Sequence, residues 1–451
     1  MLLRRALFTS LILAGCSNDP GLPPLPTIAE VPAFEDINPD PHIVEVNLRA
    51  AGVTLELKPF YSTDVLAYNG TLPGPLLEAR VGDRIIVHFQ NDLAEATTIH
   101  WHGLRIPSDQ DGNPMVQGPI PAGGSFTYDF TVPDAGTFWF HPHMGTIEQI
   151  DRGMYGAIIV TEADPPKFTA ERLYVIDDIR LSSNGQIAPY AYSGHDVMMG
   201  RLGDTLLTNG KVTAPTSTAP LGSIERWRIV NASTARVFEI AVDGASWRVI
   251  ATDGGLLSTP YKTDKLTVAP GQRFELEVTY DQAASAARLL SYDAYTDNPP
   301  AVPMANVNIA GEVSAKPPVY PQVTLPALTD AALDKEIRLG ANAQGFTIND
   351  VVADAEPMME LTQGQPVRLT VINEIGPYHP FHLHGQFFQI LTRNGMPANE
   401  PGLKDTVLLD SFDKVTLLTY FENPGMWMYH CHIPEHAENG MMAHLMVDPA
   451  P

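Results

Sequence analysis

Ten of the fourteen histidines of the chain fall into four short clusters. The clusters are His100 with His102, His141 with His143, His379 with His382 and His384, and His430 with His432 and His436. Each cluster contains one H-x-H pair, so the four pairs offer eight imidazoles. Imidazole binds copper, zinc, iron and nickel. Eight converging imidazoles can therefore hold more than one metal ion.

The second chemical signal is Cys431, which lies between two of these histidines and has His436 and Met441 just downstream. On a strand, successive side chains point to opposite faces, so the flanking histidines can join the imidazole group while the thiolate binds another metal. Two imidazoles, a thiolate and a weak thioether form a blue-copper electron-transfer site. We expect His379, which is left over from the H-x-H pairs, to supply the second imidazole.

Cys431 would then conduct electrons between two metal sites. An electron that reaches the sulfur-bound copper crosses only Cys431 and a neighbouring histidine to reach the imidazole group, a path on the order of 10 Å. Electron donors would be oxidised at the outer site, and a multi-copper inner site can collect electrons for dioxygen. A structural zinc site needs fewer ligands than this arrangement provides.

Three similar β-strand segments are expected to position these ligands. They read "GDRIIVHFQN" (82–91), "GSIERWRIVN" (222–231) and "GQPVRLTVIN" (364–373), each a turn glycine, a strand with period-two alternation and an asparagine. Their spacing of about 140 residues predicts three related β domains. We therefore expect an all-β protein built from three Greek-key β-sandwiches.

Proline-rich stretches near 162–168 and 315–322 mark the expected domain boundaries. The predicted domains are 41–165, 166–318 and 319–451. The first and third domains share motifs, since "HWHG" matches "HLHG" and "HPH" matches "HCH". We expect their histidine clusters to meet at the interface of these two domains.

The middle domain is predicted to hold no metal ligands, because its one histidine, His195, stands alone. The whole chain has a formal net charge of −24, with 28 basic and 52 acidic residues. Such a surface repels phosphate backbones, so nucleic-acid binding is not expected.

The chain begins with features of an export signal. Arg4 and Arg5 precede an apolar run over 6–15 that is too short to span a bilayer. Leu13-Ala14-Gly15-Cys16 resembles the lipobox of bacterial lipoproteins, so we expect 1–16 to be a lipoprotein-type signal peptide and Cys16 to be acylated. Residues 17–40 are expected to form a proline-rich tether.

Lipid on Cys16 is the one membrane attachment that we expect, and it places the protein in a bacterial cell envelope, in a periplasmic or other extracytoplasmic compartment. Cys431 would then be the only thiol of an exported protein, which excludes a disulfide within the mature fold. A bound metal would protect this thiol from oxidation.

The motifs "HWHG", "HPH", "HPFHLHG" and "HCHIPEHAENGM" together resemble those of the multicopper oxidase family, of the three-domain bacterial laccase-like type, over about residues 42–448. The resemblance implies three cupredoxin-like domains and four copper ions. The implied ligands are His379, Cys431, His436 and axial Met441 for type 1 copper; His100 and His382 for type 2 copper; and His102, His141, His143, His384, His430 and His432 for the type 3 pair.

The resemblance also implies the reaction. The family oxidises four substrate molecules by one electron each and reduces O2 to two waters. Electrons usually enter at the position of His436, which is often close to the surface. Asp111 matches a family carboxylate near type 2 copper that helps to deliver protons, although an Asp before Gly is also a common turn residue. Asp111, Cys431 and His436 are thus the candidate catalytic residues.

Two departures from the family pattern bear on function. Ala437 stands where many bacterial relatives have an acid that donates protons, which leaves Glu435 and Glu438 as candidates for that role. Ile375 and Pro377 replace an Asp and a Met of the copper-efflux oxidases, and no Met-rich insert is present in the sequence. This argues against a dedicated cuprous oxidase of that type.

The leading hypothesis is a laccase-like oxidase of phenols or aromatic amines. The alternative is an envelope oxidase of metal ions, Cu(I), Fe(II) or Mn(II), which the negative surface keeps open. A third hypothesis, a copper-free cupredoxin-fold protein that acts in envelope assembly, is disfavoured because every ligand position is filled.

Overall fold

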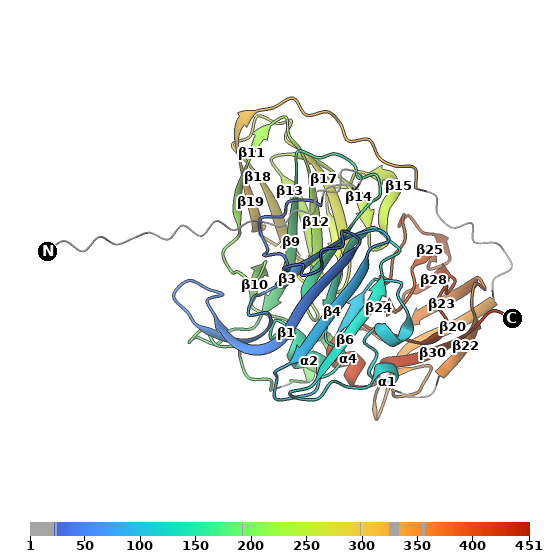
Figure 1. Ribbon diagram of the computed structural model, residues 1–451. Helices are drawn as coiled ribbons and strands as arrows, with labels where there is room; N and C mark the ends of the chain where they lie inside the picture. The colour runs from blue at the N-terminus through green and yellow to red at the C-terminus, as the bar shows by residue number, and fades with distance from the viewer. Residues whose placement is uncertain (1–21, 23–24, 192, 298, 324–332, 354–356) are drawn as a thin grey trace.

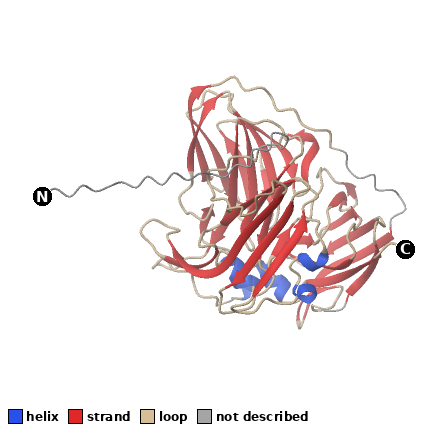
Figure 2. Cartoon of the chain, viewed as in Figure 1, coloured by secondary structure: helices blue, strands red, loops and turns tan. Residues whose placement is uncertain are grey.

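The computed structural model describes residue 22 and residues 25–191, 193–297, 299–323, 333–353 and 357–451. The predicted signal peptide, with Cys16, lies outside these ranges. Within them, no helix combines the length and the apolar character needed to cross a bilayer. Figures 1 and 2 show that the described chain is built mainly of strands arranged in three β-sandwiches, which confirms the predicted all-β class.

The first sandwich packs a sheet of order β2-β1-β4-β6 on a sheet of order β3-β8-β7-β5. Its strands are β1 (Ile43–Leu55), β2 (Thr63–Tyr68), β3 (Gly74–Arg80), β4 (Arg84–Asn91), β5 (His100–His102), β6 (Ser125–Thr131), β7 (Gly136–His141) and β8 (Gly156–Thr161). Its helices are η1 (Ser108–Gln110), α1 (Pro114–Gln117) and α2 (Thr146–Asp151).

The second sandwich pairs a six-stranded sheet, β10-β9-β12-β17-β14-β15, with a five-stranded sheet, β11-β19-β18-β13-β16. Its elements are β9 (Ala170–Ile179), α3 (Gly194–Met199), β10 (Thr205–Thr208), β11 (Thr216–Leu221), β12 (Ile224–Asn231), β13 (Phe238–Asp243), β14 (Ser246–Thr252), β15 (Gly255–Tyr261), β16 (Leu266–Val268), β17 (Arg273–Thr279), β18 (Ala286–Asp293) and β19 (Val302–Glu312).

The third sandwich has the same plan, with sheets β21-β20-β23-β28-β25-β26 and β22-β30-β29-β24-β27. Its elements are β20 (Leu333–Asn342), β21 (Gly345–Ile348), β22 (Pro357–Thr362), β23 (Val367–Asn373), β24 (His379–Leu383), β25 (Phe388–Arg393), β26 (Met396–Pro397), β27 (Thr406–Leu409), β28 (Lys414–Thr419), β29 (Gly425–Cys431), α4 (Pro434–Glu438) and β30 (Met442–Asp448).

The asparagine that ends each repeated strand makes the same kind of hydrogen bond in every sandwich. Asn91, Asn231 and Asn373 close β4, β12 and β23, and each side-chain amide donates to backbone carbonyls of the loops at the strand end. Asn231 Nδ2, for example, lies 2.9 Å from the carbonyls of Arg236 and Val268. A buried loop needs such partners for its backbone, which explains why the repeat ends on an amide.

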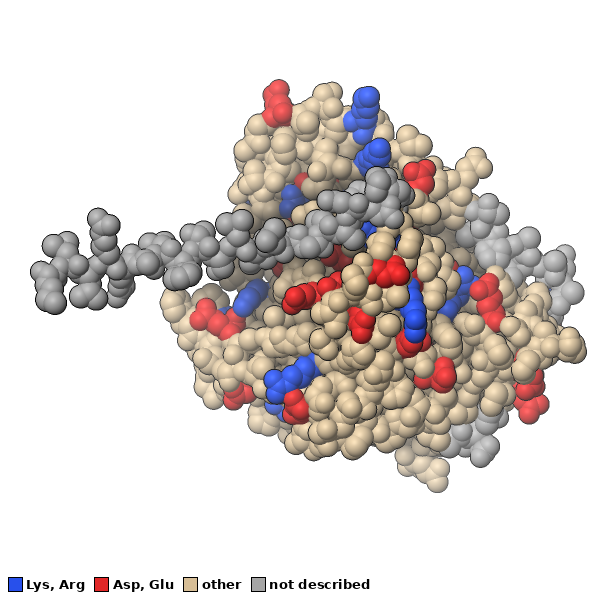
Figure 3. Space-filling view, viewed as in Figure 1, with Lys and Arg blue, Asp and Glu red and all other residues tan. Residues whose placement is uncertain are grey.

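The helices are short, and they gather at one end of the molecule (Figure 2). There α4 of the third sandwich contacts both α2 of the first and α3 of the second. On the face shown in Figure 3, acidic and basic side chains are scattered among neutral ones and form no continuous basic patch. The three sandwiches therefore meet around α4, which follows the strand that carries Cys431.

We predict that Gly385→Ala lowers the free energy of unfolding by about 1–3 kcal/mol. Gly385 follows β24 with φ +71°, and a Cβ there would lie 2.3 Å from ring carbons of the buried Trp427. Urea unfolding of copper-free protein measures the change. Gly194→Ala is the matched control, because its Cβ would meet nothing within 4 Å. Equal unfolding midpoints for the two variants would contradict the prediction.

Candidate metal centres

Strand register places the predicted ligands of the third sandwich on two faces of one sheet. In the antiparallel pair β24–β29, Phe381 is opposite Cys431 and His382 is opposite His430. Because side chains alternate, Cys431 points into the third sandwich while His382 and His430 point out of it, towards the first. The strand thus separates two groups of predicted ligands, as the H-C-H spacing predicts.

Three side chains inside the third sandwich form the outer cluster: His379, Cys431 and His436. The Cys431 Sγ lies 3.5 Å from His379 Nδ1 and 3.4 Å from His436 Nδ1, and the two nitrogens are 3.0 Å apart. All three residues are buried. Met441 is also buried, and its backbone bonds that of Cys431 (3.1 Å) and that of His436 (2.9 Å).

His436 owes its place to α4, which begins at Pro434 and turns the chain back after β29. Pro is favoured in the first turn because the missing N–H has no helical partner there. The His436 ring packs against Phe346, with ring centroids 4.3 Å apart, and its Nε2 lies 3.1 Å from the carbonyl oxygen of Met198 in α3. The side chain has no exposed surface, because α3 covers the ring at Nε2.

Eight imidazoles form the inner cluster between the first and third sandwiches, which confirms the expected interface. They are His100, His102, His141, His143, His382, His384, His430 and His432. His100 Nε2 lies 3.4 Å from His382 Nε2, and His384 Nε2 lies 3.1 Å from His430 Nε2. Several triplets bring their ligand atoms within 4.8 Å of one another. Nitrogens this close fit around shared ions with metal–imidazole bonds of about 2 Å.

Backbone carbonyls orient half of these rings. The Nδ1 atoms of His100, His141, His382 and His430 lie 2.8–2.9 Å from the carbonyl oxygens of Asp111, Pro142, Asp405 and Cys431. A ring that donates from Nδ1 carries its lone pair on Nε2, which faces the centre of the cluster. The carbonyls therefore select the tautomer that a metal ion needs.

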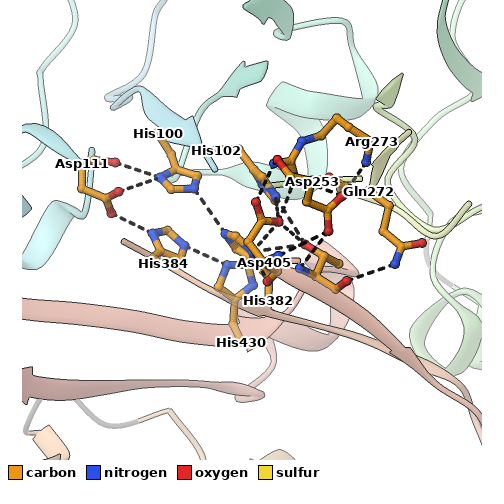
Figure 4. Close-up of polar contacts among 12 residues, drawn as sticks. His100, His102, Asp111, Asp253, Gln272, Arg273, His382, His384, Asp405 and His430 are labelled. Atoms are coloured by element: carbon orange, nitrogen blue, oxygen red, sulfur yellow. Dashed lines mark hydrogen bonds and ion pairs between the residues drawn. The ribbon is translucent and has the colours of Figure 1, made fainter. Parts of the chain in front are cut away.

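Carboxylates orient two further rings (Figure 4). Asp111 Oδ2 lies 2.7 Å from His384 Nδ1, so this predicted residue supports two imidazoles, one by its backbone and one by its side chain. His102 uses the other ring nitrogen for its protein contact, since its Nε2 lies 3.0 Å from Asp405 Oδ1. Its Nδ1 is buried and has no partner among the described residues.

Several ring nitrogens of the inner cluster have no protein partner in the described part of the chain, and they are suited to bind metal ions. Within the described residues, the buried ring nitrogens that lack a hydrogen-bond partner include His102 Nδ1, His141 Nε2, His143 Nε2 and both nitrogens of His432. Leaving them unpaired would cost free energy, whereas metal ligation satisfies them. Burial also lowers the pKa of these imidazoles, so they remain neutral, as ligands must.

The outer cluster has the same properties. Burial lowers the pKa of His436 to about 4 and raises that of the Cys431 thiol. A thiolate is stable in such a place when a metal ion supplies the compensating positive charge. The donor set of two imidazoles and one sulfur suits copper.

The two acids considered as replacements for a residue at Ala437 lie in different environments. Glu438 is exposed, and its Oε1 accepts from Thr146 Oγ1 at 2.6 Å at the start of α2. Glu435 is buried, accepts from the Arg201 N–H at 3.1 Å, and has its pKa raised to about 7 by burial. Burial and pKa favour Glu435 as a group that exchanges protons near neutral pH.

Four residues around the inner cluster were not predicted from the sequence: Asp253, Arg273, Asp405 and Thr406. They come from the second and third sandwiches, and no motif marks them, because isolated Asp, Arg and Thr residues in strands and turns are common. His195, which stands alone in the sequence, lies exposed on α3 and belongs to neither cluster.

Comparison with known proteins agrees with this geometry. Three family models, each described as multicopper oxidase, match residues 52–165, 184–302 and 314–451. The multicopper oxidase MmcO of Mycobacterium tuberculosis is 30% identical over 433 residues, which cover 86% of this chain and 83% of that protein.

Solved structures are similar over nearly the whole chain. A Campylobacter jejuni multicopper oxidase, described as a metallo-oxidase, has a TM-score of 0.83 and 29% identity, covering 96% of this chain and 97% of that one. A laccase-like multicopper oxidase from Ochrobactrum, described as active towards lignin model compounds, has a TM-score of 0.82 and 26% identity, covering 94% and 100%.

Members of this family have cupredoxin domains and use copper to pass electrons from a reductant to O2. The family models, the whole-length relatives and the buried histidine and cysteine clusters lead to the same result. The chain belongs to the multicopper oxidase family and is a copper oxidoreductase with O2 as its electron acceptor.

Proposed function

We propose that the protein is a laccase-like oxidase that couples four one-electron oxidations of phenols or aromatic amines to the reduction of O2 to two waters. One observation carries the proposal: Cys431 contacts both outer imidazoles, while its neighbours His430 and His432 belong to the inner cluster. Bound copper supplies the one-electron chemistry at both centres. Cys431 and its two peptide neighbours provide the shortest covalent connection between them.

We assign the ligands accordingly. His379, Cys431 and His436 would hold type 1 copper, with Met441 as the axial ligand. His100 and His382, whose Nε2 atoms lie 3.4 Å apart, would hold type 2 copper. The remaining six imidazoles of the inner cluster would hold the type 3 pair: His102, His141, His143, His384, His430 and His432.

Asp111 is the proposed proton-handling residue beside the inner cluster. Its carboxylate is buried, and burial raises its pKa, so the group holds a proton more readily than an ordinary Asp. Its Oδ2 contacts His384, and its Oδ1 has no hydrogen-bond partner among the described residues. Oδ1 lies 3.4 Å from His100 Nδ1, and we assign to this oxygen the uptake and release of a proton beside the inner cluster.

A metal-ion oxidase is the second candidate, and α3 is the observation that favours it. This helix covers His436, so a phenol has no direct contact with the ring. The Met198 side chain is 43% exposed, and His195 is exposed on the same helix, three residues earlier. Thioether and imidazole groups suit Cu(I).

The proposed location is the bacterial cell envelope, with lipid on Cys16 as the attachment. The support is the lipobox-like sequence alone, since this segment lies outside the described residues.

Steady-state oxygen uptake separates the two candidates. The laccase-like proposal predicts rapid uptake with a substituted phenol and slow uptake with Cu(I), Fe(II) or Mn(II) at equal concentration. Two single variants, Met198→Leu and His195→Ala, test whether α3 binds the metal ion. Each should raise KM for a metal ion only if α3 binds it. Fast uptake with one metal ion and none with phenols would overturn the laccase-like proposal.

We predict that Cys431→Ser removes the intense visible absorption and abolishes turnover. A hydroxyl provides no thiolate-to-copper charge transfer and no efficient electron path, but it fills nearly the same volume. Copper analysis, the visible spectrum and oxygen uptake measure these effects, and the melting temperature of copper-free protein reports whether the fold persists. A blue colour that survives the substitution would show that Cys431 is not the ligand.

Met441→Leu is predicted to raise the reduction potential of type 1 copper. The thioether donates electron density that favours the oxidised ion, and an isobutyl group does not. Redox titration followed by visible absorption gives the potential. Met442→Leu is the matched control, because Met442 is the next residue and has no assigned role. A potential that is unchanged or lower in Met441→Leu would exclude Met441 as the axial ligand.

A further inference from the structure

The second sandwich holds none of the proposed copper ligands, yet one of its side chains binds Asp405, the carboxylate that accepts from His102 of the inner cluster. Arg273 begins β17 and has no exposed surface. Its guanidinium donates to both oxygens of Asp405, with Nη1 at 2.8 Å from Oδ1 and Nη2 at 2.6 Å from Oδ2 (Figure 4). Two parallel N–H···O bonds fix the plane of a carboxylate as well as its position.

The other guanidinium donors are also occupied. Nε donates to the Thr137 carbonyl at 3.1 Å, Nη1 to the Gly271 carbonyl at 3.0 Å, and Nη2 to the Asp253 carbonyl at 3.0 Å. With the two bonds to Asp405, all five N–H donors have acceptors, and these come from all three sandwiches. A Lys ammonium has three donors and no planar fork, so it cannot reproduce this set.

Two glycines allow this close approach. Gly103, the last residue of "HWHG", has φ +91°, and a Cβ there would lie 2.3 Å from Arg273 Nη2 and 2.8 Å from Asp405 Oδ2. Gly271 has φ +87°, and its Cβ would lie 3.1 Å from His102 Cε1. Any side chain at Gly103 would displace the guanidinium from the carboxylate.

Asp405 in turn determines how His102 is held. Its Oδ1 accepts from His102 Nε2 at 3.0 Å and from Thr406 Oγ1 at 2.9 Å. With its proton on Nε2, the His102 ring carries its lone pair on Nδ1, the buried nitrogen for which the described part of the chain offers no partner. His100 and His141 have the opposite arrangement, with Nδ1 on a carbonyl.

We propose that Arg273 is a positioning residue for the inner copper cluster: it fixes the Asp405 carboxylate in the orientation that accepts from His102 Nε2 and so aims His102 Nδ1 at the type 3 pair. The second sandwich thereby completes a metal site to which it gives no ligand. This inference rests on the proposed assignment of His102 as a type 3 ligand.

A purely structural role is the competing explanation, because Arg273 also joins three domains. Arg226 provides the matched control. It is equally buried, lies on β12 of the same sandwich, and holds two carboxylates, with Nη2 at 2.7 Å from Glu162 Oε1 and Nε at 2.7 Å from Glu275 Oε2. No contact joins Arg226 to either cluster in the described part of the chain.

The experiment compares copper-loaded, full-length wild-type protein with Arg273→Met, Arg273→Lys and Arg226→Met. Copper per chain, the blue absorption and the EPR-detectable copper fraction are measured, together with melting temperature. Two Cu(II) ions coupled through a shared oxygen give no EPR signal, so this fraction reports on an intact type 3 pair. Removing a hydrogen bond that orients a metal ligand typically weakens metal binding by about 10- to 100-fold.

We expect Arg273→Met and Arg273→Lys to lose type 3 copper or to make it EPR-detectable while the blue absorption is unchanged. Arg226→Met should melt earlier and keep wild-type copper content and EPR fraction. If Arg273→Met behaves like Arg226→Met, Arg273 is only structural and the proposal fails. If Arg273→Met does not fold, Asp405→Asn is measured in its place. This substitution keeps the shape of the Asp405 side chain and replaces one of the two oxygens that accept from Arg273. Loss of the EPR-silent pair in Asp405→Asn then supports the proposal, and wild-type copper content and EPR fraction contradict it.

The wild-type measurement tests the proposed function separately. Wild-type protein that binds copper with no EPR-silent fraction lacks a type 3 pair, which would overturn the proposed function whatever the variants do. Wild-type protein with a silent pair that persists in Arg273→Met and Asp405→Asn overturns the Arg273 proposal alone.

Discussion

Each buried imidazole has two nitrogens, and both must be accounted for. Six of the eight rings of the inner cluster meet this demand by giving one nitrogen to a protein acceptor, which leaves the other nitrogen for a proposed metal ion. Carbonyls at 2.8–2.9 Å serve His100, His141, His382 and His430, and carboxylates serve His102 and His384. The positions of these acceptors therefore decide where lone pairs converge.

The acceptors are fixed by the fold. A carbonyl that follows a strand is placed by strand register, so the β24–β29 pairing positions both His382 and the support of His430. Strand register does not determine the orientation of the Asp405 carboxylate, because its side chain can rotate. Arg273 removes that freedom, and Gly103 provides the space for it. Residues of all three sandwiches thus build a site whose proposed ligands come from two of them.

Much of this arrangement could be predicted from sequence because it depends on local spacing. Period-two alternation identified β4, β12 and β23, and the H-C-H spacing predicted that Cys431 and its neighbours face opposite ways. The grouping of His379 with His436 also followed from counting ligands.

Contacts between distant residues could not be predicted in this way. Arg273 and Asp405 are separated by 132 residues, and neither stands in a motif with a chemical meaning of its own. The burial of His436 under α3 depends on how the second sandwich sits on the third, and nothing in the local sequence encodes that packing.

The wide separation of the inner ligands along the chain has a consequence for biogenesis. His100 and His382 are 282 residues apart, and their Nε2 atoms meet only when the first and third sandwiches have docked. A nascent chain that has emerged as far as the second sandwich offers at most half of the imidazoles. The complete set of eight imidazoles therefore exists only after synthesis of the third sandwich and its docking on the first.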